Sequence, residues 1–341
     1  MSATAQAERR NEGRSAISGA HEEYSTRLCP AANALSPPGG RVVSLTAADG
    51  VRLRAAFWPA RVERPRGTVS VLPGRAEFIE KYGEVVDELL ARGFAVAVLD
   101  LRGQGGSQRE LADPLKGHVD DFSLYTLDIA ALESGLLAPF APRPWFGLAH
   151  SMAACACLLA AQADALPFER LVACAPLIQI YSLETARAPR LLAASLDALG
   201  LGGAYIPGGG ARSALLKPFP GNALTSDERR YARNAALAHA CPGLALGDPT
   251  IGWVAACFRA VDLLAQPETA RRVAAPTLAL LAGEDRVVSS RAAENFLARM
   301  KVGLALTLPG ARHEILMETD AVREQFWAAF DAFIPGSGNL A

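Results

Sequence analysis

The chain has 341 residues, of which 50% are hydrophobic and 20% are charged, and its formal net charge is −1. This length and apolar content allow a large buried core, either in two domains or in one α/β domain that carries an insertion. A net charge so close to zero, without a long basic stripe, argues against nucleic acid as a partner.

Residues 1–40 are predicted to form a disordered leader, because they are mostly polar and end in a run of Ser, Pro and Gly. The first 15 residues lack the apolar stretch that a secretory signal needs, so a cytoplasmic location is expected. Residues 145–163 contain no Asp, Glu, Lys or Arg and are long enough to suggest a membrane span. They change character midway and include polar residues, and we interpret them as a buried strand followed by a buried helix.

Strands and helices alternate along most of the chain. Strands at 42–45 and 51–58 surround Asp49-Gly50, which is a strong signal for a hairpin. The pattern then predicts strands at 68–72, 94–101, 145–149 and 171–175, and helices at 78–91, 124–137 and 152–163. Several of these strands are almost wholly apolar, which is typical of a mostly parallel sheet that helices cover on both faces.

The alternation stops near residue 177. Residues 177–255 contain Gly- and Pro-rich segments mixed with helical pieces, so we predict that they form an inserted lid. The alternation resumes with a strand at 277–281, a helix at 291–299, a strand at 304–308 and a final helix at 319–333. The predicted organisation is an α/β core formed by 41–176 and 256–335, the lid between these two parts, and a tail at 336–341.

The pentapeptide Ala149-His150-Ser151-Met152-Ala153 lies between a predicted strand and a predicted helix. A serine on a sharp turn at such a junction is exposed as a nucleophile above the sheet, and the next backbone N–H points toward the substrate oxyanion. The turn requires small residues two positions before and two after the serine, and both are alanine here instead of the usual glycine. Alanine resists positive φ more than glycine does.

Asp285 and His313 each follow a predicted strand, at 277–281 and 304–308. The carboxyl ends of parallel strands are where such sheets place their chemistry. The order Ser, Asp, His along the chain is also one of the orders known for a serine-hydrolase triad. We therefore predict Ser151 as nucleophile, His313 as its base and Asp285 as the acid, with Glu284 as the alternative acid.

The loop at Pro73-Gly74-Arg75-Ala76 lies between the predicted strand at 68–72 and its helix. This is where the second donor to the oxyanion is expected. We predict that the backbone N–H groups of Arg75 and Met152 form the oxyanion hole. The guanidinium of Arg75 is interpreted as a surface charge without a catalytic role.

Four segments resemble the lysophospholipase and monoacylglycerol lipase family of α/β-hydrolases: LPGRAEFIEKY at 72–82, DLRGQGGS at 100–107, GDPTIGW at 247–253 and GARHE at 310–314. The resemblance covers about residues 40–335. It implies an α/β-hydrolase fold with a lid, no cofactor, and ester substrates that carry an acyl chain. It also implies the triad Ser151, Asp285 and His313 and the oxyanion donors Arg75 and Met152. The chain departs from the family in the two elbow alanines and in Pro73, where many relatives have histidine.

Other functions remain open at this point. The same triad serves peptidases and thioesterases, and a catalytically inactive hydrolase fold could bind a ligand or a partner instead. His150 adjoins the predicted nucleophile but is interpreted as structural, because the strained turn directs its side chain away from the position of a base.

The six cysteines are scattered and form no metal-binding pattern. We therefore predict reduced thiols packed as small hydrophobic groups, and no metal site. The lid contains a leucine-rich stretch at 191–201, which predicts packing against the core, burial of an acyl chain or contact with a membrane surface. The oligomeric state is not predicted.

Overall fold

The fold is built on an eight-stranded sheet, which we describe from a computed structural model for residues 21–32, 36–183 and 186–335. The strand order is β1-β2-β4-β3-β5-β6-β7-β8. The strands are β1 (Arg41–Thr46), β2 (Arg52–Trp58), β3 (Thr68–Leu72), β4 (Ala95–Asp100), β5 (Trp145–His150), β6 (Arg170–Cys174), β7 (Thr277–Ala282) and β8 (Gly303–Leu308). The pairs β1–β2 and β2–β4 are antiparallel, and the remaining pairs are parallel.

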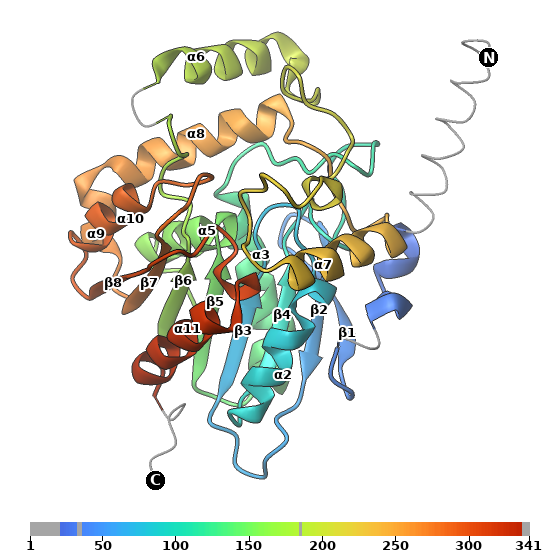
Figure 1. The fold of residues 1–341 in the computed structure, drawn as a ribbon, viewed down its shortest axis with the longest axis vertical. Helices are drawn as coiled ribbons and strands as arrows, with labels where there is room; N and C mark the ends of the chain where they lie inside the picture. The colour runs from blue at the N-terminus through green and yellow to red at the C-terminus, as the bar shows by residue number, and fades with distance from the viewer. Residues whose placement is uncertain (1–20, 33–35, 184–185, 336–341) are drawn as a thin grey trace.

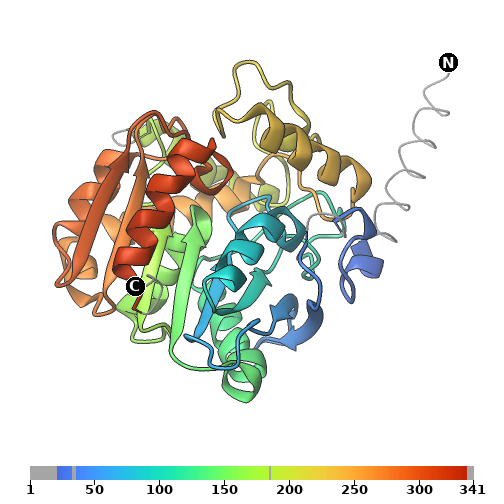
Figure 2. The same ribbon diagram turned by 60° about the horizontal axis from the view of Figure 1, so that its bottom comes forward.

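Helices cover both faces of this sheet, as the sequence predicts (Figure 1). On one face lie α2 (Gly83–Ala91) and α11 (Asp320–Phe333), and Figure 2 shows the same pair in front of the strands. On the opposite face lie α3 (Leu124–Leu132) and α5 (Met152–Gln162). Every residue of β3, β4, β5 and β7 is buried, which explains why these strands have no alternation of polar and apolar residues.

The hairpin predicted at Asp49-Gly50 is present between β1 and β2. Gly50 adopts a φ of +86°, and its N–H donates to the carbonyl of Ala47. Leu45 and Leu53 are paired across the two strands, and both are buried. The hairpin therefore continues the sheet on its antiparallel side.

The polypeptide between β6 and β7 forms a layer above the carboxyl ends of the strands (Figure 1). This layer contains α6 (Arg187–Leu196), the π-helical turn η4 (Asp197–Leu201), the short η5 (Ala214–Leu216), α7 (Glu228–Ala240) and α8 (Ile251–Ala265). It is followed by α9 (Pro267–Arg272), and α10 (Ser290–Leu297) lies between β7 and β8. The layer includes the described residues of the segment 177–255, for which the sequence predicts a lid.

The prediction of a disordered leader is wrong for the part of it that the structure describes. Residues 21–24 are helical, and a 3-10 turn, η1, spans Pro30–Ala32. Tyr24 and Cys29 are buried in a small apolar cluster with Leu237 and Leu244 of the inserted layer. The segment is mostly polar, but these few apolar side chains are enough to pack it against the inserted layer. Residues 1–20 and 336–341, also predicted as leader and tail, lie outside the described residues.

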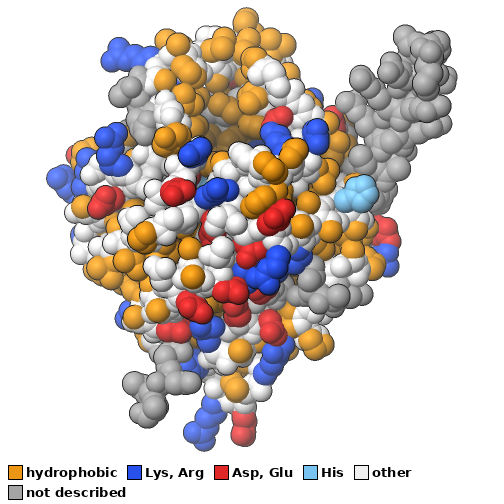
Figure 3. All heavy atoms as spheres, viewed as in Figure 1, with side chains coloured by type: hydrophobic (Ala, Val, Ile, Leu, Met, Phe, Trp, Pro, Cys, Tyr) orange, Lys and Arg blue, Asp and Glu red, His pale blue; other side chains and the backbone are white. Residues whose placement is uncertain are grey.

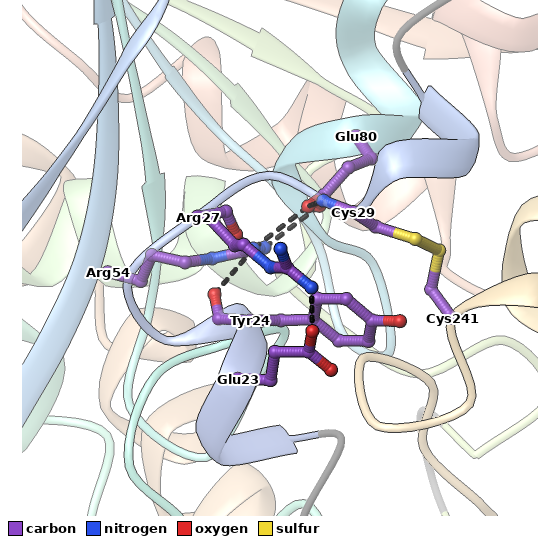
Figure 4. The surroundings of a disulfide bond; sticks show 7 residues. All are labelled: Glu23, Tyr24, Arg27, Cys29, Arg54, Glu80 and Cys241. Atoms are coloured by element: carbon purple, nitrogen blue, oxygen red, sulfur yellow. Dashed lines mark hydrogen bonds and ion pairs between the residues drawn. A yellow bond between two sulfur atoms is a disulfide. The ribbon is translucent and has the colours of Figure 1, made fainter.

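The prediction that all cysteines are reduced thiols is wrong for Cys29 and Cys241. They form a disulfide across a separation of 212 residues, joining the N-terminal segment to the end of α7 (Figure 4). The backbone N–H of Cys29 donates to the buried carboxylate of Glu80, which fixes the segment at the bond. The other four cysteines, Cys155, Cys157, Cys174 and Cys257, are free and buried. Because disulfides persist mainly in oxidising compartments, the bond argues against the expected cytoplasmic location.

Residues 145–163 form β5 and then α5, as the sequence predicts. In the described part of the chain, no helix has the length and apolar character needed to span a bilayer.

Replacing Cys241 by serine should lower the free energy of unfolding by about 2–4 kcal/mol, because the bond closes a very long loop. Urea denaturation with and without dithiothreitol measures this effect. The reductant should destabilise the native protein to the level of Cys241→Ser and leave that variant unchanged. Free thiols at both positions in a non-reducing peptide digest of the oxidised protein would contradict the prediction.

Candidate active site

Ser151 lies at the junction of β5 and α5 with φ +50° and ψ −112°. Its N–H donates to the carbonyl of Cys174 on the neighbouring strand, and this bond holds the turn against β6. Ala149 is the last but one residue of β5, and Ala153 lies in the first turn of α5, neither with positive φ. Only the serine of the pentapeptide carries backbone strain, so both alanines fit the elbow without it.

His313 and Asp285 reach the serine from the loops that follow β8 and β7. The Nε2 atom of His313 lies 3.0 Å from Oγ of Ser151, and its Nδ1 atom lies 2.9 Å from Oδ2 of Asp285. The exposed fractions of the three residues are 7% for the serine, 8% for the aspartate and 4% for the histidine. The structure thus brings together the three residues that the sequence singles out.

Asp285 is held as an ionised acceptor. Its Oδ1 atom accepts the backbone N–H groups of Val287 and Val288, at 2.8 and 2.9 Å. Burial favours a higher pKa for this carboxyl, but the hydrogen bonds from His313 and the two backbone groups lower the pKa below its usual value. Glu284, the alternative acid, is exposed and makes no contact with His313 in the described structure.

The loop after β3 brings the backbone of Arg75 to the same cavity as Met152. The loop turns at Ala76, whose φ of +61° is stabilised by a hydrogen bond from its N–H to Oε1 of Gln104. A side chain at Gly74 would place its Cβ 2.8 Å from Nδ1 of His150, so only glycine fits this close approach. Within the described residues, the N–H groups of Arg75 and Met152 donate to no protein acceptor.

A buried charge network lies beside the candidate triad, and the sequence analysis missed it. The carboxylate of Glu77 accepts hydrogen bonds from Lys81, Tyr82 and the N–H of Gly74, and it is 2.9 Å from Nδ1 of His150. The sequence signal for it was the spacing of Glu77 and Lys81, two opposite charges four positions apart at the start of a helix-like segment.

His150 bridges this network to the histidine loop. Its Nδ1 faces the carboxylate of Glu77, and its Nε2 lies 3.1 Å from the carbonyl oxygen of His313. Both partners only accept hydrogen bonds when the carboxylate is ionised, so the arrangement is satisfied by an imidazolium that donates from both nitrogens. Burial lowers the pKa of His150, but the charge and hydrogen bond of Glu77 outweigh this effect and raise the pKa above its usual value.

The second carboxylate in the network is that of Glu314, 2.7 Å from Nζ of Lys81. Burial lowers the pKa of Lys81, but Glu314 and Glu77 on either side raise the pKa above its usual value. Two carboxylates therefore face two cations, Lys81 and His150, and all four side chains are buried.

A cavity of about 550 Å³ opens above Ser151 between the sheet and the inserted layer. Its volume is typical of a site for a small molecule. Most of its lining side chains are apolar, and those of the inserted layer include Leu192, Leu196, Leu215, Trp253 and Phe258. Figure 3 shows hydrophobic side chains gathered around the hollow in the upper part of the molecule.

Arg75 lines this cavity, and its guanidinium packs against Trp253, another lining residue, which corrects its interpretation as a surface charge. One of its terminal nitrogens donates to the carbonyl of Gly247, and its Cζ lies 5.3 Å from the ring centre of Trp253. Burial lowers the pKa of Arg75 to about 10, so the group is a cation at neutral pH. The ionisable residues that line the cavity in the described structure are this arginine, the two histidines and the paired carboxylates of Glu77 and Glu314.

Residues 63–320 match the family described as serine aminopeptidase, S33. The chain belongs to this α/β-hydrolase family. It is 34% identical over 286 residues to lysophospholipase L2 of Escherichia coli, with 82% of each chain covered. It is 30% identical to "Probable lysophospholipase L2" of Haemophilus influenzae, over 79% of this chain and 84% of that protein. The chain is thus a hydrolase similar to lysophospholipase L2.

Solved structures of other α/β-hydrolases share the fold at lower identity. A soluble variant of monoglyceride lipase from Saccharomyces cerevisiae, in complex with a substrate analog, has a TM-score of 0.67 at 19% identity, over 86% of this chain and 95% of that chain. A thermostable carboxyl esterase from Bacillus coagulans has a TM-score of 0.70 at 19% identity, over 88% and 99% of the two chains. At this identity the likeness concerns the fold alone.

Replacing His150 by glutamine should destabilise the protein in a pH-dependent manner. The raised pKa means that the contribution of the charged histidine is fully present below its unfolded pKa, near 6.5, and is lost as the pH rises through the folded pKa. We expect the variant to lose about 3 kcal/mol of unfolding free energy at pH 6, as for a broken buried ion pair, and less at higher pH. Urea denaturation at several pH values measures this difference.

The matched control makes the same substitution, His150→Gln, in a protein that already carries Glu77→Gln. Without the carboxylate of Glu77, His150 loses its paired anion. The pH-dependent part of the destabilisation by His150→Gln should therefore disappear in this background. A destabilisation by His150→Gln alone that stays constant between pH 6 and 9 would mean that the native histidine is neutral.

Proposed function

We propose that the protein hydrolyses carboxylic esters of lipids that carry one acyl chain, through an acyl-enzyme on Ser151. The observation that carries this proposal is the hydrogen-bonded series from Ser151 through His313 to Asp285 at the base of an apolar cavity of about 550 Å³. The relatives named lysophospholipase L2 support the same class of substrate.

The first half of the reaction transfers the acyl group to the serine. Asp285 is ionised and accepts from Nδ1–H of His313, which leaves Nε2 free to accept the serine proton. As Nε2 takes this proton, Oγ of Ser151 bonds to the ester carbonyl carbon, and the carbonyl oxygen becomes an oxyanion. The bond from carbon to the alcohol oxygen then breaks, and the Nε2 proton passes to the departing alcohol.

The oxyanion requires donors that are already in position. The N–H groups of Met152 and Arg75 are available for this role, one at the start of α5 and one in the loop after β3. Loss of one such donor typically reduces the rate on the order of 10²–10³-fold.

Water completes the cycle. His313 removes a proton from a water molecule that attacks the acyl carbonyl, and the tetrahedral oxyanion again lies between the two N–H groups. When the bond to Oγ breaks, the proton on Nε2 returns to Ser151, and the carboxylic acid is released.

Charge distribution favours an ester over a peptide with a free amino terminus. An amino-terminal ammonium would require an unpaired carboxylate in the cavity. The two carboxylates that line the cavity, Glu77 and Glu314, are both paired with Lys81. The alternative of a catalytically inactive binding protein is disfavoured. The elbow is formed despite its two alanines, and Ser151 is hydrogen-bonded to its base, His313.

Labelling with a fluorophosphonate tests the role of Ser151. The native protein should react, Ser151→Ala should not, and Asp285→Asn should hydrolyse esters on the order of 10³–10⁴-fold more slowly than the native protein. Intact-protein mass spectrometry measures the adduct. A folded native protein that remains unlabelled would reject the proposed role of Ser151 and bring the binding-protein alternative forward.

The substrate class is tested on the same preparation with a panel of acyl monoesters, thioesters and aminoacyl amides. Because the cavity walls are mostly apolar, we expect kcat/KM to be highest for medium or long acyl esters. A profile that peaks at acetyl esters, or at amides, would exclude the proposed class.

We also propose that the inserted layer contacts membrane surfaces peripherally. Leu191 and Leu199 are 67% and 74% exposed, and both belong to the segment of α6 and η4 at the top of Figure 1. Leu192 of the same helix both lines the cavity and is 53% exposed. Apolar side chains around a cavity mouth favour contact with a lipid surface.

The combined change Leu191→Ser and Leu199→Ser should weaken binding to phospholipid vesicles at least about tenfold, since each leucine that leaves the interface forfeits apolar burial. Co-sedimentation measures the partition. The matched control is Leu304→Ser with Leu306→Ser, which removes two exposed leucines from the edge strand β8. Equal binding by both variants would contradict the proposed surface.

A further inference from the structure

Arg75 places a positive charge inside a cavity whose walls are otherwise mostly apolar. It lies in the loop immediately after β3 and lines the space above Ser151. The proposed function uses only its backbone N–H. The side chain of Arg75 is thus a charged group in the candidate site, and no step of the proposed reaction involves it.

The guanidinium has no anionic partner in the described structure. No carboxylate of the described residues forms an ion pair with it; its polar contact is the carbonyl of Gly247, and its Nε is buried without a hydrogen-bond acceptor. Asp248 contributes a favourable charge, but its carboxylate accepts the N–H of Gly210 and lies 3.9 Å from Lys217. A buried donor left without an acceptor is costly, which indicates that a bound group completes the set.

The neighbouring ring defines how that group can approach. The guanidinium lies over Trp253, with 5.3 Å between Cζ and the ring centre, so one of its faces is occupied. The edge of a guanidinium presents parallel N–H donors that match the oxygens of a phosphate or carboxylate. Nε, which has no acceptor in the described structure, is one of the donors of such an edge.

Arg75 is placed to contact two groups of one substrate, the ester through its backbone and an anion through its side chain. Its backbone N–H is the proposed oxyanion donor, and its side chain is about as long as the glycerol bridge between ester and phosphate in a lysophospholipid. When the ester carbonyl is held at the backbone, the phosphodiester comes within reach of the guanidinium. A monoacylglycerol has no anion at that place.

We propose that the guanidinium of Arg75 binds the phosphodiester of a lysophospholipid and makes it a better substrate than the corresponding monoacylglycerol. This inference rests on the proposed ester hydrolysis at Ser151. It assigns the arginine side chain a role in substrate specificity.

The test compares octanoyl lysophosphatidylcholine with octanoyl glycerol, two monomeric substrates that share an acyl chain. For Arg75→Met, which retains an apolar side chain of similar length, kcat/KM for the phospholipid should fall at least about tenfold more than kcat/KM for the glycerol ester. Arg75→Lys should recover part of the loss, because it restores the charge without the paired donors. Lys217→Met, which removes an exposed cation beside Asp248, should leave the ratio as in the native protein.

Octanoyl lysophosphatidylglycerol separates recognition of the phosphodiester from recognition of choline. It should respond to Arg75→Met as lysophosphatidylcholine does. An equal loss for all three substrates would show that the side chain only shapes the oxyanion loop, and an effect confined to the choline lipid would assign recognition to the choline group. Either result would overturn the proposal.

Binding to Ser151→Ala keeps this test separate from the test of the reaction. Isothermal titration with the same three lipids should show weaker binding of both phospholipids when Arg75→Met is added, and little change for octanoyl glycerol. If the native protein cleaves none of these esters, the proposed function fails, while the titration still decides whether Arg75 selects the phosphodiester. Equal affinities with and without Arg75→Met would reject the anion site.

Discussion

The buried carboxylate of Glu77 connects three loops of the candidate site. It accepts the N–H of Gly74 in the oxyanion loop and faces Nδ1 of His150 at the serine elbow. It also binds Lys81, whose ammonium reaches Glu314 in the loop of the base His313. A displacement of any of these loops would break a buried hydrogen bond or ion pair of this network, which is costly in free energy. The network therefore holds the serine, its base and the oxyanion donors in one mutual geometry.

The fold and the candidate triad were predictable from sequence because their signals are local. The strands are visible as short apolar runs, and Ser151, Asp285 and His313 each lie in the turn or loop that follows one of them. The parallel arrangement then places the ends of these strands at one edge of the sheet, whatever the details of the helices. Whether alanine is compatible with the elbow depends on the backbone angles at its two positions. In that pentapeptide only Ser151 has a positive φ, so both alanines are compatible with the turn.

The contacts that were not predictable join residues far apart in the chain. Glu77 and His150 are 73 positions apart, and Cys29 and Cys241 are 212 apart. No periodicity in the sequence encodes such pairs. The first depends on the pairing of β3 with β5, and the second on how the inserted layer and the N-terminal segment pack together. The same holds for Arg75, whose position looks like an exposed turn until the layer above it is in place.

The inserted layer is attached to the core unequally at its two ends. The α7 side is tied by the disulfide at Cys241 and by Arg230, which binds Glu84 and Asp320 and donates to the carbonyl of Glu318. These contacts continue into the site, because η2 (Ile79–Tyr82) carries Glu80 toward the N-terminal segment and Lys81 toward the charge network.

The α6 side has weaker polar attachments in the described chain. Its Arg190 pairs with Asp262, which is 62% exposed, and donates to Oε1 of Gln179, while the helix packs on α8 through apolar side chains such as Ala193. An exposed ion pair contributes little to stability, whereas a buried one is costly to break. Opening the cavity by displacing α6 therefore requires less free energy than displacing α7. The wall that carries the exposed leucines is thus the one that can admit a lipid, while the wall tied to the charge network keeps the triad and the oxyanion loop in position.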